Sequence, residues 1–305
     1  MTSVTDVVLA VDAGGTKYLG GVVDHAGDVP YEREVQTPLS GERRDLGLAT
    51  LRDLFQSLRE YAVAAGDRVC GLGVGVPEYV RDGRLTSAEV LAWSAQPIDL
   101  LTGDFPDLPV LVEADVRCAA YAEARIGWPQ SSNLLYVSWG TGLSSTLVVD
   151  GRCVAGRRGE AIALGELGVA AAVDPAWTGN LEDFSSGLGV ADRYTRVTGS
   201  PASGREVAEL AGSGDADARV VLGSAAEAVG HALRACTYLL DPDVIVLGGG
   251  IGSGGGELPR LVAERLPALL ARPERPPVVP ARLGARAGLL GAGLLGWERV
   301  SAEAR

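Results

Sequence analysis

The sequence predicts an α/β protein with two lobes that are built from two similar halves. Its 305 residues exceed the length of one typical hydrophobic core, so two lobes are expected. An apolar run broken by a glycine-rich turn occurs at residues 7–29 and again at 134–151. Each half also has a later strand that ends in glycine-rich or proline residues, at 71–77 and 244–250. This repeated order favours a duplicated fold, with nucleotide phosphates held in a cleft between facing loops.

The first half is predicted to begin with three strands and a helix. Val7 to Val11 is a short run of apolar residues, which is typical of a buried strand. The helix is indicated by apolar residues that recur at spacings near three and four, namely Leu46, Leu51, Leu54, Leu58 and Tyr61. In chain order we expect strands at 7–11, 18–23 and 28–37, a helix at 42–65, a strand at 69–76, a loop-rich stretch at 80–108 and a strand at 108–113.

The second half is predicted to repeat this plan after a helix that starts beside Asp115. Its hairpin occupies residues 134–156, and a glycine-rich tip follows a buried strand at 248–256. The remaining elements are helices at 116–126, 205–212, 217–240 and 257–271, a strand at 243–248, and a last helix from about residue 287.

The turn Asp12-Ala13-Gly14-Gly15-Thr16-Lys17 joins two strands. A Walker loop and a dinucleotide fingerprint both open a helix, so neither fits this turn. Its backbone N–H groups can approach a phosphate closely because no side chain intervenes. Asp12 is suited to hold hydrated Mg²⁺, and Lys17, the only lysine, adds a positive charge. The alternative is an ordinary Gly-Gly hairpin turn with Asp12 as its cap.

Composition excludes several classes of protein. The net charge of −12 argues against nucleic-acid binding, which needs clustered lysine and arginine. No apolar run of about 18 residues is present, and the N-terminus lacks a signal-peptide pattern, so we expect a cytoplasmic protein without a membrane segment. The four cysteines have no paired spacing, which favours core residues over disulfides or a metal site.

Several motifs together resemble the ROK (repressor, open reading frame, kinase) family, within the superfamily of sugar kinases, actin and heat-shock chaperones. They are DAGGTK, EADVRCAA, WGTG, GELG, LEDFSSG and DPDVIVLGGG. The resemblance implies an actin-like, ribonuclease-H-like fold, with a small lobe of residues 1–115 and 287–305 and a larger lobe of 116–286. It also implies ATP and Mg²⁺ as cofactors, a small-molecule sugar substrate and a homodimer. ROK repressors carry a helix-turn-helix domain before the first strand, and the six residues there are too few for one.

The resemblance assigns roles to individual residues. Asp115 follows a strand and precedes a helix, which by itself fits a helix cap; its match to the family motif makes it the candidate general base. Glu166 and Glu182 match glutamates that bind sugar hydroxyls in the family. The candidate phosphate-binding residues are Gly14, Gly15, Thr16, Lys17, Gly140, Thr141, Gly142, Gly248, Gly249 and Gly250.

The sequence also departs from the family pattern around the sugar. Val169 replaces the histidine of the family's zinc cluster, and its three cysteines are missing, so we expect Trp177 and Ala170–Ala172 to hold the 169–180 loop by packing. Ala114 replaces the asparagine before the base, Arg117 a small polar residue and Glu78 a glycine. All four replacements are candidate substrate-binding positions. They favour a seven-carbon cyclitol or another non-glucose polyol over the default hexose, and a non-catalytic sugar sensor is the alternative to a kinase.

Overall fold

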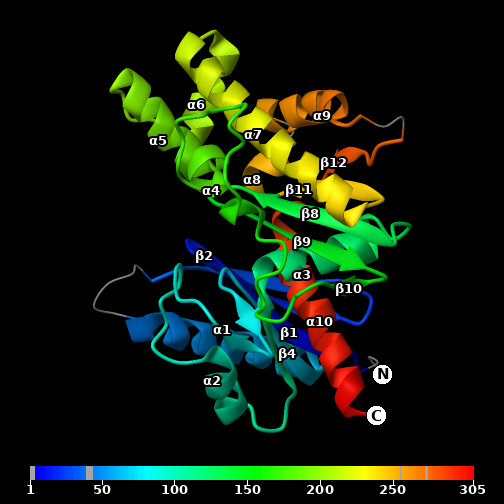
Figure 1. The fold of residues 1–305 in the computed structure, drawn as a ribbon. Coiled ribbons are helices and arrows are strands. Elements are labelled where there is room, and N and C mark those ends of the chain that lie inside the picture. Colours follow the sequence, from blue (N-terminus) through cyan, green and yellow to red (C-terminus); the bar gives the residue numbers. More distant parts are fainter. Residues whose placement is uncertain (1–3, 39–43, 255, 272–273) are drawn as a thin grey trace. The chain divides into compact units, whose positions relative to one another are not determined.

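The computed structural model describes residues 4–38, 44–254, 256–271 and 274–305 (Figure 1). The chain forms two compact units. The first comprises Met1–Ala122, Ala155–Ala161 and Arg286–Arg305, and the second comprises Glu123–Val154 and Ile162–Ala285. The boundary expected at 115/116 therefore shifts to the end of a helix at Ala122, and residues 155–161 join the first unit instead of the second.

The first unit is built on a five-stranded mixed sheet with the order β3-β2-β1-β4-β7. The β1–β2–β3 part is antiparallel, whereas β4 and β7 run parallel to β1. The strands are β1 (Asp6–Ala13), β2 (Lys17–Asp24), β3 (Tyr31–Gln36), β4 (Arg68–Val76) and β7 (Val110–Ala114). This confirms the strands expected in this half to within a few residues.

Helices cover both faces of this sheet because successive strand residues point to opposite sides. Val7, Leu9 and Val11 of β1 pack on the side of α1 (Arg44–Ala65), where Leu51, Leu54 and Leu58 are buried. Ala10 packs on the opposite side, against α10 (Ala287–Glu303). The remaining elements of the unit are α2 (Pro97–Asp104), α3 (Asp115–Ala122), the hairpin β5 (Val80–Arg81) and β6 (Arg84–Leu85), and a 3₁₀ turn Gly284–Arg286 of which Arg286 belongs here.

The second unit repeats the same sheet plan, with the order β10-β9-β8-β11-β12. Its first three strands are antiparallel, and β11 and β12 are parallel to β8, as in the first unit. The strands are β8 (Asn133–Trp139), β9 (Leu143–Val149), β10 (Arg152–Cys153), β11 (Val244–Gly248) and β12 (Val278–Pro280). The duplication expected from the repeated glycine-broken runs is confirmed at the level of sheet topology.

The helices of the second unit pack around a core that includes Leu135, Val137 and Phe184. The α6 helix begins with a capping box of Ser203 and Glu206, and Asp215 caps α7. The helices are α4 (Leu181–Ser185), α5 (Gly187–Thr198), α6 (Gly204–Ser213), α7 (Ala216–Leu240), α8 (Gly249–Gly252) and α9 (Glu257–Leu269), with a 3₁₀ turn at Leu164–Glu166.

Several sequence-based expectations need correction. The helix expected over 116–126 is α-helical only to Ala122 and continues as a π-helical turn, Glu123–Gly127. The glycine-rich tip after β11 forms one helical turn, α8, in place of an open loop. Leu46 and Tyr61 of the predicted apolar stripe are exposed on α1. The hairpin β5–β6, strand β12 and helices α2, α4 and α5 were not expected. The expected start of α1 at Glu42 lies outside the described residues.

Candidate active site

Three acidic residues of the first unit follow the carboxyl ends of three neighbouring parallel strands. Asp12 is near the end of β1, Glu78 follows β4 and Asp115 follows β7. The strand register places Asp12 opposite Gly75, and Gly75 opposite the residue two before Asp115. Crevices outside the carboxyl ends of parallel strands are where open α/β sheets bind ligands. The sheet therefore gathers the candidate base and the candidate metal-binding residue at one edge.

Asp115 is the first residue of α3 and is partly buried. Its Oδ1 accepts a hydrogen bond of 2.5 Å from the backbone N–H of Val116. Burial, and next the negative charge of Asp12, raise the pKa of Asp115 to about 7, and the Glu78 charge acts in the same direction. A carboxylate whose pKa lies near neutral pH is suited to accept a proton from a hydroxyl group.

Asp12 lies between two glycines, of which Gly288 leaves room for its carboxylate. A Cβ atom on Gly288, in the first turn of α10, would lie 2.4 Å from Asp12 Oδ2. A Cβ on Gly75 would lie 3.5 Å from Oδ1. Burial raises the pKa of Asp12 to about 6, while the Lys17 charge opposes this rise. Within the described residues no protein donor binds the Asp12 carboxylate, so its hard oxygen atoms fit a hydrated Mg²⁺ ion.

The turn between β1 and β2 is held by its own backbone and leaves its tip open to solvent. Gly14 N–H donates to the Lys17 carbonyl at 3.0 Å, and the Thr37 hydroxyl donates to the Gly14 carbonyl at 2.7 Å. Gly15 and Thr16 at the tip are exposed. Lys17 is half-exposed and pairs with Glu34 at 2.7 Å. The backbone of this tip is therefore accessible to a phosphate group, as the candidate assignment requires.

The corresponding turn of the second unit lies beside the other glycine-rich segment. Gly140 N–H donates to the Gly142 carbonyl at 2.9 Å, and a Cβ on Gly140 would lie 3.4 Å from the Gly250 nitrogen. Thr141 and Gly250 are exposed, whereas Gly248 and Gly249 allow β11 to pass close to β8. A Cβ on Gly249, for example, would lie 2.5 Å from the Trp139 carbonyl. The structure thus brings together the candidate phosphate-binding residues of this unit.

Glu182 and Glu166 lie near this turn, in different surroundings. Glu182 accepts a hydrogen bond of 2.6 Å from Leu143 N–H, and a Cβ on Gly142 would lie 2.9 Å from its Oε2. Glu166 is exposed at the end of the 3₁₀ turn Leu164–Glu166. The same turn passes close to Glu182, because a Cβ on Gly165 would lie 3.2 Å from Glu182 Cβ. Glu182 therefore holds the turn, while Glu166 is open to a ligand.

Arg117 and Glu78 are both buried and bound to protein groups. The Arg117 guanidinium donates to Glu113 Oε1, to the Val80 carbonyl at 2.6 Å and to the Gly159 carbonyl at 2.9 Å. It thereby joins the end of β7 to the β5 strand and to segment 155–161. Glu78 accepts four hydrogen bonds from nearby groups. Their assignment to substrate binding stays a prediction, and the contacts observed here are with the protein itself.

Ala114 and Val169 give apolar surfaces at the two positions where the resemblance leads us to expect polar ones. Ala114 is buried at the end of β7, directly before Asp115. Val169 is partly buried and packs against the core of the second unit. The loop that follows is held by Trp177, whose ring packs edge-on against the Phe184 ring with 5.0 Å between the ring centroids. Ala171 and Ala172 are exposed, so the expected packing of the alanine run was wrong for these two residues.

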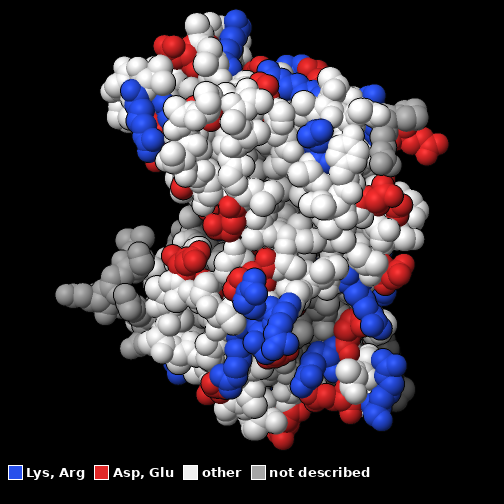
Figure 2. Space-filling model, in the orientation of Figure 1, with Lys and Arg blue, Asp and Glu red and all other residues white. Residues whose placement is uncertain are grey.

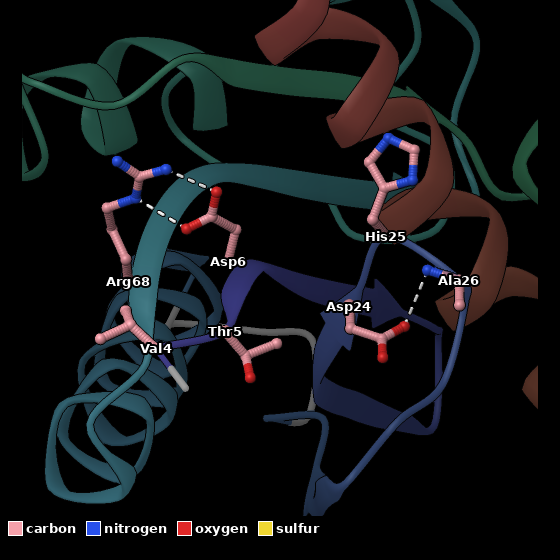
Figure 3. A pocket seen from close by; sticks show the side chains of 7 residues that line it. All are labelled: Val4, Thr5, Asp6, Asp24, His25, Ala26 and Arg68. Atoms are coloured by element: carbon pink, nitrogen blue, oxygen red, sulfur yellow. Dashed lines mark hydrogen bonds and ion pairs between the residues drawn. The ribbon is translucent and has the colours of Figure 1, made fainter. Parts of the chain in front are cut away.

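A shallow hollow at the opposite end of β1 contains a separate group of charged residues (Figure 3). Arg68 donates to both carboxylate oxygens of Asp6, at 2.7 and 2.5 Å. Asp24 accepts the Ala26 N–H at 2.9 Å, and the exposed His25 ring packs on Trp297. Since Arg68 and Asp6 bind each other, Asp24 binds the backbone, and the hollow lies at the far end of β1 from Asp12, we place no part of the reaction there.

Sequence reasoning found the acidic residues and missed the glycines that surround them. Gly75 is part of an alternating Gly-Val strand and Gly288 of a Gly/Ala/Leu helix, so neither has a local signal of function. The role of Gly288 follows from the approach of α10 to Asp12, which joins positions 276 residues apart in the chain (288 minus 12), and Gly75 is placed opposite Asp12 by the pairing of β1 with β4. These glycines can be identified only from their position next to Asp12 in the folded protein.

The family model of the ROK family matches residues 8–298. Among curated relatives, the bifunctional enzyme NanE/NanK of Brucella melitensis is 32% identical over 291 residues, covering 93% of this chain and 52% of the relative. The chain thus spans about half the length of the curated relatives it matches first. An N-acetylmannosamine kinase of Yersinia pseudotuberculosis is 29% identical over 305 residues, covering 96% of this chain and 98% of the relative.

Two solved structures are similar over nearly their whole length. A ROK hexokinase from Thermus thermophilus has a TM-score of 0.83 and 29% identity, covering 97% of this chain and 99% of that one. A ROK family glucokinase from Streptomyces griseus, in complex with glucose and AMPPNP, has a TM-score of 0.75 and 27% identity, covering 96% and 99%.

Proposed function

The chain belongs to the ROK family, with the actin-like fold of its sugar kinases, and we propose that it is an ATP- and Mg²⁺-dependent carbohydrate kinase. The observation that carries this proposal is Asp115, a partly buried carboxylate with a pKa of about 7 beside Asp12 at the carboxyl edge of the first sheet. Phosphoryl transfer needs positioning, charge neutralisation and one base; Asp115 supplies the base, and Asp12 would supply charge neutralisation through the Mg²⁺ that it holds.

Each residue has a defined task in the proposed reaction. Asp115 accepts the proton of the acceptor hydroxyl as the hydroxyl oxygen bonds to the terminal phosphorus of ATP, and the bond from that phosphorus to the departing ADP breaks. Asp12 would hold Mg²⁺ through water, and the bound ion would supply positive charge beside the phosphates. The exposed backbone of Gly14, Gly15 and Thr16 binds phosphate oxygens. Gly140–Gly142 and Gly250 are the proposed counterparts of this turn in the second unit.

The proposed acceptor is a small carbohydrate. The charge of −12 opposes binding to a polyanion, and Figure 2 shows acidic side chains beside the basic ones in the lower part of the drawn face. In the described part of the chain, every helix is too short or too polar to cross a bilayer. We propose a soluble substrate such as N-acetylmannosamine, since a kinase for that sugar is among the relatives, or a cyclitol.

Two apolar positions bear on the choice of acceptor. If Ala114 and Val169 face the ring, as the resemblance implies, a hexose would lose two hydrogen bonds there. An unpaired buried hydroxyl costs about 1–3 kcal/mol, so two would lower kcat/KM on glucose by roughly two to three powers of ten. A cyclitol without the ring oxygen and anomeric hydroxyl would avoid part of this loss.

The deciding experiment measures ADP release from ATP with a panel of acceptors. The panel contains N-acetylmannosamine, glucose, mannose, N-acetylglucosamine and hydroxymethyl cyclitols. We expect one non-glucose acceptor to be preferred, with weak turnover of glucose. A glucose kcat/KM above about 10⁴ M⁻¹s⁻¹ would refute the substrate proposal but not the kinase. Sugar binding without any ADP release would instead support the alternative, a non-catalytic sugar sensor.

A further inference from the structure

The carboxylate of Glu78 lies inside a ring of hydrogen-bond donors from a single loop. Its Oε2 accepts the Ser87 hydroxyl at 2.5 Å and the Glu89 N–H at 3.0 Å. Its Oε1 accepts the N–H groups of Val90 and Leu91, both at 2.8 Å. The Glu78 side chain is only 5% exposed. A carboxylate offers about four lone-pair sites, and here each oxygen already accepts two bonds.

The loop held by Glu78, residues 87–91, contacts the phosphate-binding turn. A Cβ on Gly15 would lie 2.9 Å from Val90 Cγ1, so the Val90 side chain rests directly on the tip of the turn. Leu91, the next residue, is buried in the core beside α1. The Ser87 hydroxyl also accepts the Tyr79 N–H at 2.9 Å, which fixes the start of the loop to the residue after Glu78. The loop is therefore fixed at both ends and presses on Gly15 between them.

We propose that Glu78 is a positioning residue whose ionised carboxylate holds loop 87–91 against the turn Gly14–Lys17, and thereby sets the position of the phosphate-binding backbone. This deepens the proposed kinase function, on which its catalytic consequence rests. It also replaces direct sugar binding as the role of Glu78, because a sugar hydroxyl would have to displace one of the four donors.

The four donors around Glu78 favour an ionised carboxylate as their common hydrogen-bond acceptor. Three backbone N–H groups and one hydroxyl converge on Glu78, and hydrogen bonds to an ionised group are stronger than those between neutral groups. In Glu78→Gln the side-chain NH₂ group would replace one carboxylate oxygen and face two of these four donors with donors of its own. The buried donors would then lose their partner, and the loop would open more often.

The first test compares hydrogen exchange in Glu78→Gln and in Asp82→Asn, without any substrate. Asp82 is an exposed residue of the β5–β6 turn, so its substitution removes the same charge from the same segment and leaves the donor ring intact. We expect Glu78→Gln to speed amide exchange at residues 89–91 by at least tenfold and to speed exchange in the 14–17 turn as well. Exchange equal to that of Asp82→Asn would overturn the proposal.

Two milder variants keep the test decisive if Glu78→Gln folds poorly. Ser87→Ala removes one of the four donors and should raise exchange at 89–91 by a smaller factor. Val90→Ala keeps the donor ring and removes the contact with Gly15, so exchange at 89–91 should stay slow while the turn 14–17 exchanges faster. If Val90→Ala leaves the turn unchanged, the coupling between loop and turn does not exist.

The catalytic consequence is measured by nucleotide affinity. Isothermal titration with Mg²⁺ and ADP should show about tenfold weaker binding for Glu78→Gln and Val90→Ala, and none of this loss for Asp82→Asn. In the kinase assay the loss should appear mainly in the KM for ATP and not in kcat. A rise confined to the acceptor KM, with normal exchange at 89–91, would make Glu78 a direct sugar ligand. Absence of kinase activity refutes the proposed function alone, because the exchange result does not depend on turnover.

Discussion

Asp115 is the residue on which the proposed chemistry depends. Replacing it by asparagine keeps the size of the side chain and removes its ability to accept a proton. We expect Asp115→Asn to lower kcat at least a hundredfold, which is typical for loss of a general base. Binding of Mg²⁺ and ADP should persist, since the phosphate-binding turn is separate from α3. Turnover at the wild-type rate would show that Asp115 only caps the helix.

The pKa of Asp115 makes both activity and stability depend on pH. Because the proton acceptor is the ionised form, kcat/KM should rise as the pH increases through about 7. Folding raises this pKa above its ordinary value of 3.8, so the folded state holds the proton more tightly, and the resulting stability is lost as the pH rises through about 7. Thermal melting of Asp115→Asn should therefore show a larger gain over wild type at pH 8 than at pH 5. An equal gain at both would contradict the raised pKa.

Asp115 was assigned from its match to the family motif, since by itself its place between a strand and a helix fits a cap. Asp12 was assigned from its place in the glycine-rich turn. That both lie at one edge depends on the strand order β1-β4-β7, which was not predicted. Glu78 was predicted to bind the substrate, but its bonds to residues 87–91 were not predicted, since three of its donors are backbone N–H groups. Any residue supplies such a donor, so side-chain identity carries no signal of it.

At the scale of elements, the first turn of α10 determines the space around Asp12. We expect Gly288→Ala to displace the Asp12 carboxylate, because the new Cβ would lie 2.4 Å from Oδ2. The strain should cost about 1–3 kcal/mol of stability, as overpacking does. The Mg²⁺ concentration for half-maximal activity should rise as well.

Gly212→Ala is the matched control for this substitution. Gly212 is also helical, in α6, and a Cβ there meets nothing within 4 Å. Alanine at this position should be neutral or stabilise the protein by up to about 1 kcal/mol. Equal Mg²⁺ dependence in the two variants would show that Gly288 has no part in positioning Asp12.

Helix α5 shows why element prediction failed in one place. Two of its first three residues, Gly187 and Gly189, have low helix propensity and suggest a loop. The glycines are needed because a Cβ on Gly187 would lie 2.9 Å from the Gly140 carbonyl, and one on Gly189 would lie 2.3 Å from the Asp183 carbonyl. Close packing therefore outweighs propensity, and this cannot be read from a local window of sequence.

For the whole molecule, we expect stability to be independent of chelators. Trp177 and Phe184 hold the loop after Val169 by packing, and the described residues contain no group of three or more candidate metal-binding side chains. Treatment with a zinc chelator should leave the melting temperature unchanged within about 1 °C, since only a structural metal links chelation to unfolding. A marked drop, or stoichiometric zinc in tag-free protein, would contradict this view.

Helix α10 also has a consequence for the order in which the protein is made. The sheet of the first unit ends at Ala114, yet the face containing Ala10 and Val23 is covered by Leu289 and Ala292. A ribosome translates almost all of the second unit between these two segments. The nascent first unit must therefore wait with an apolar face uncovered, while the second unit has its complete set of strands and helices. The unit that emerges first is the last one to be completed.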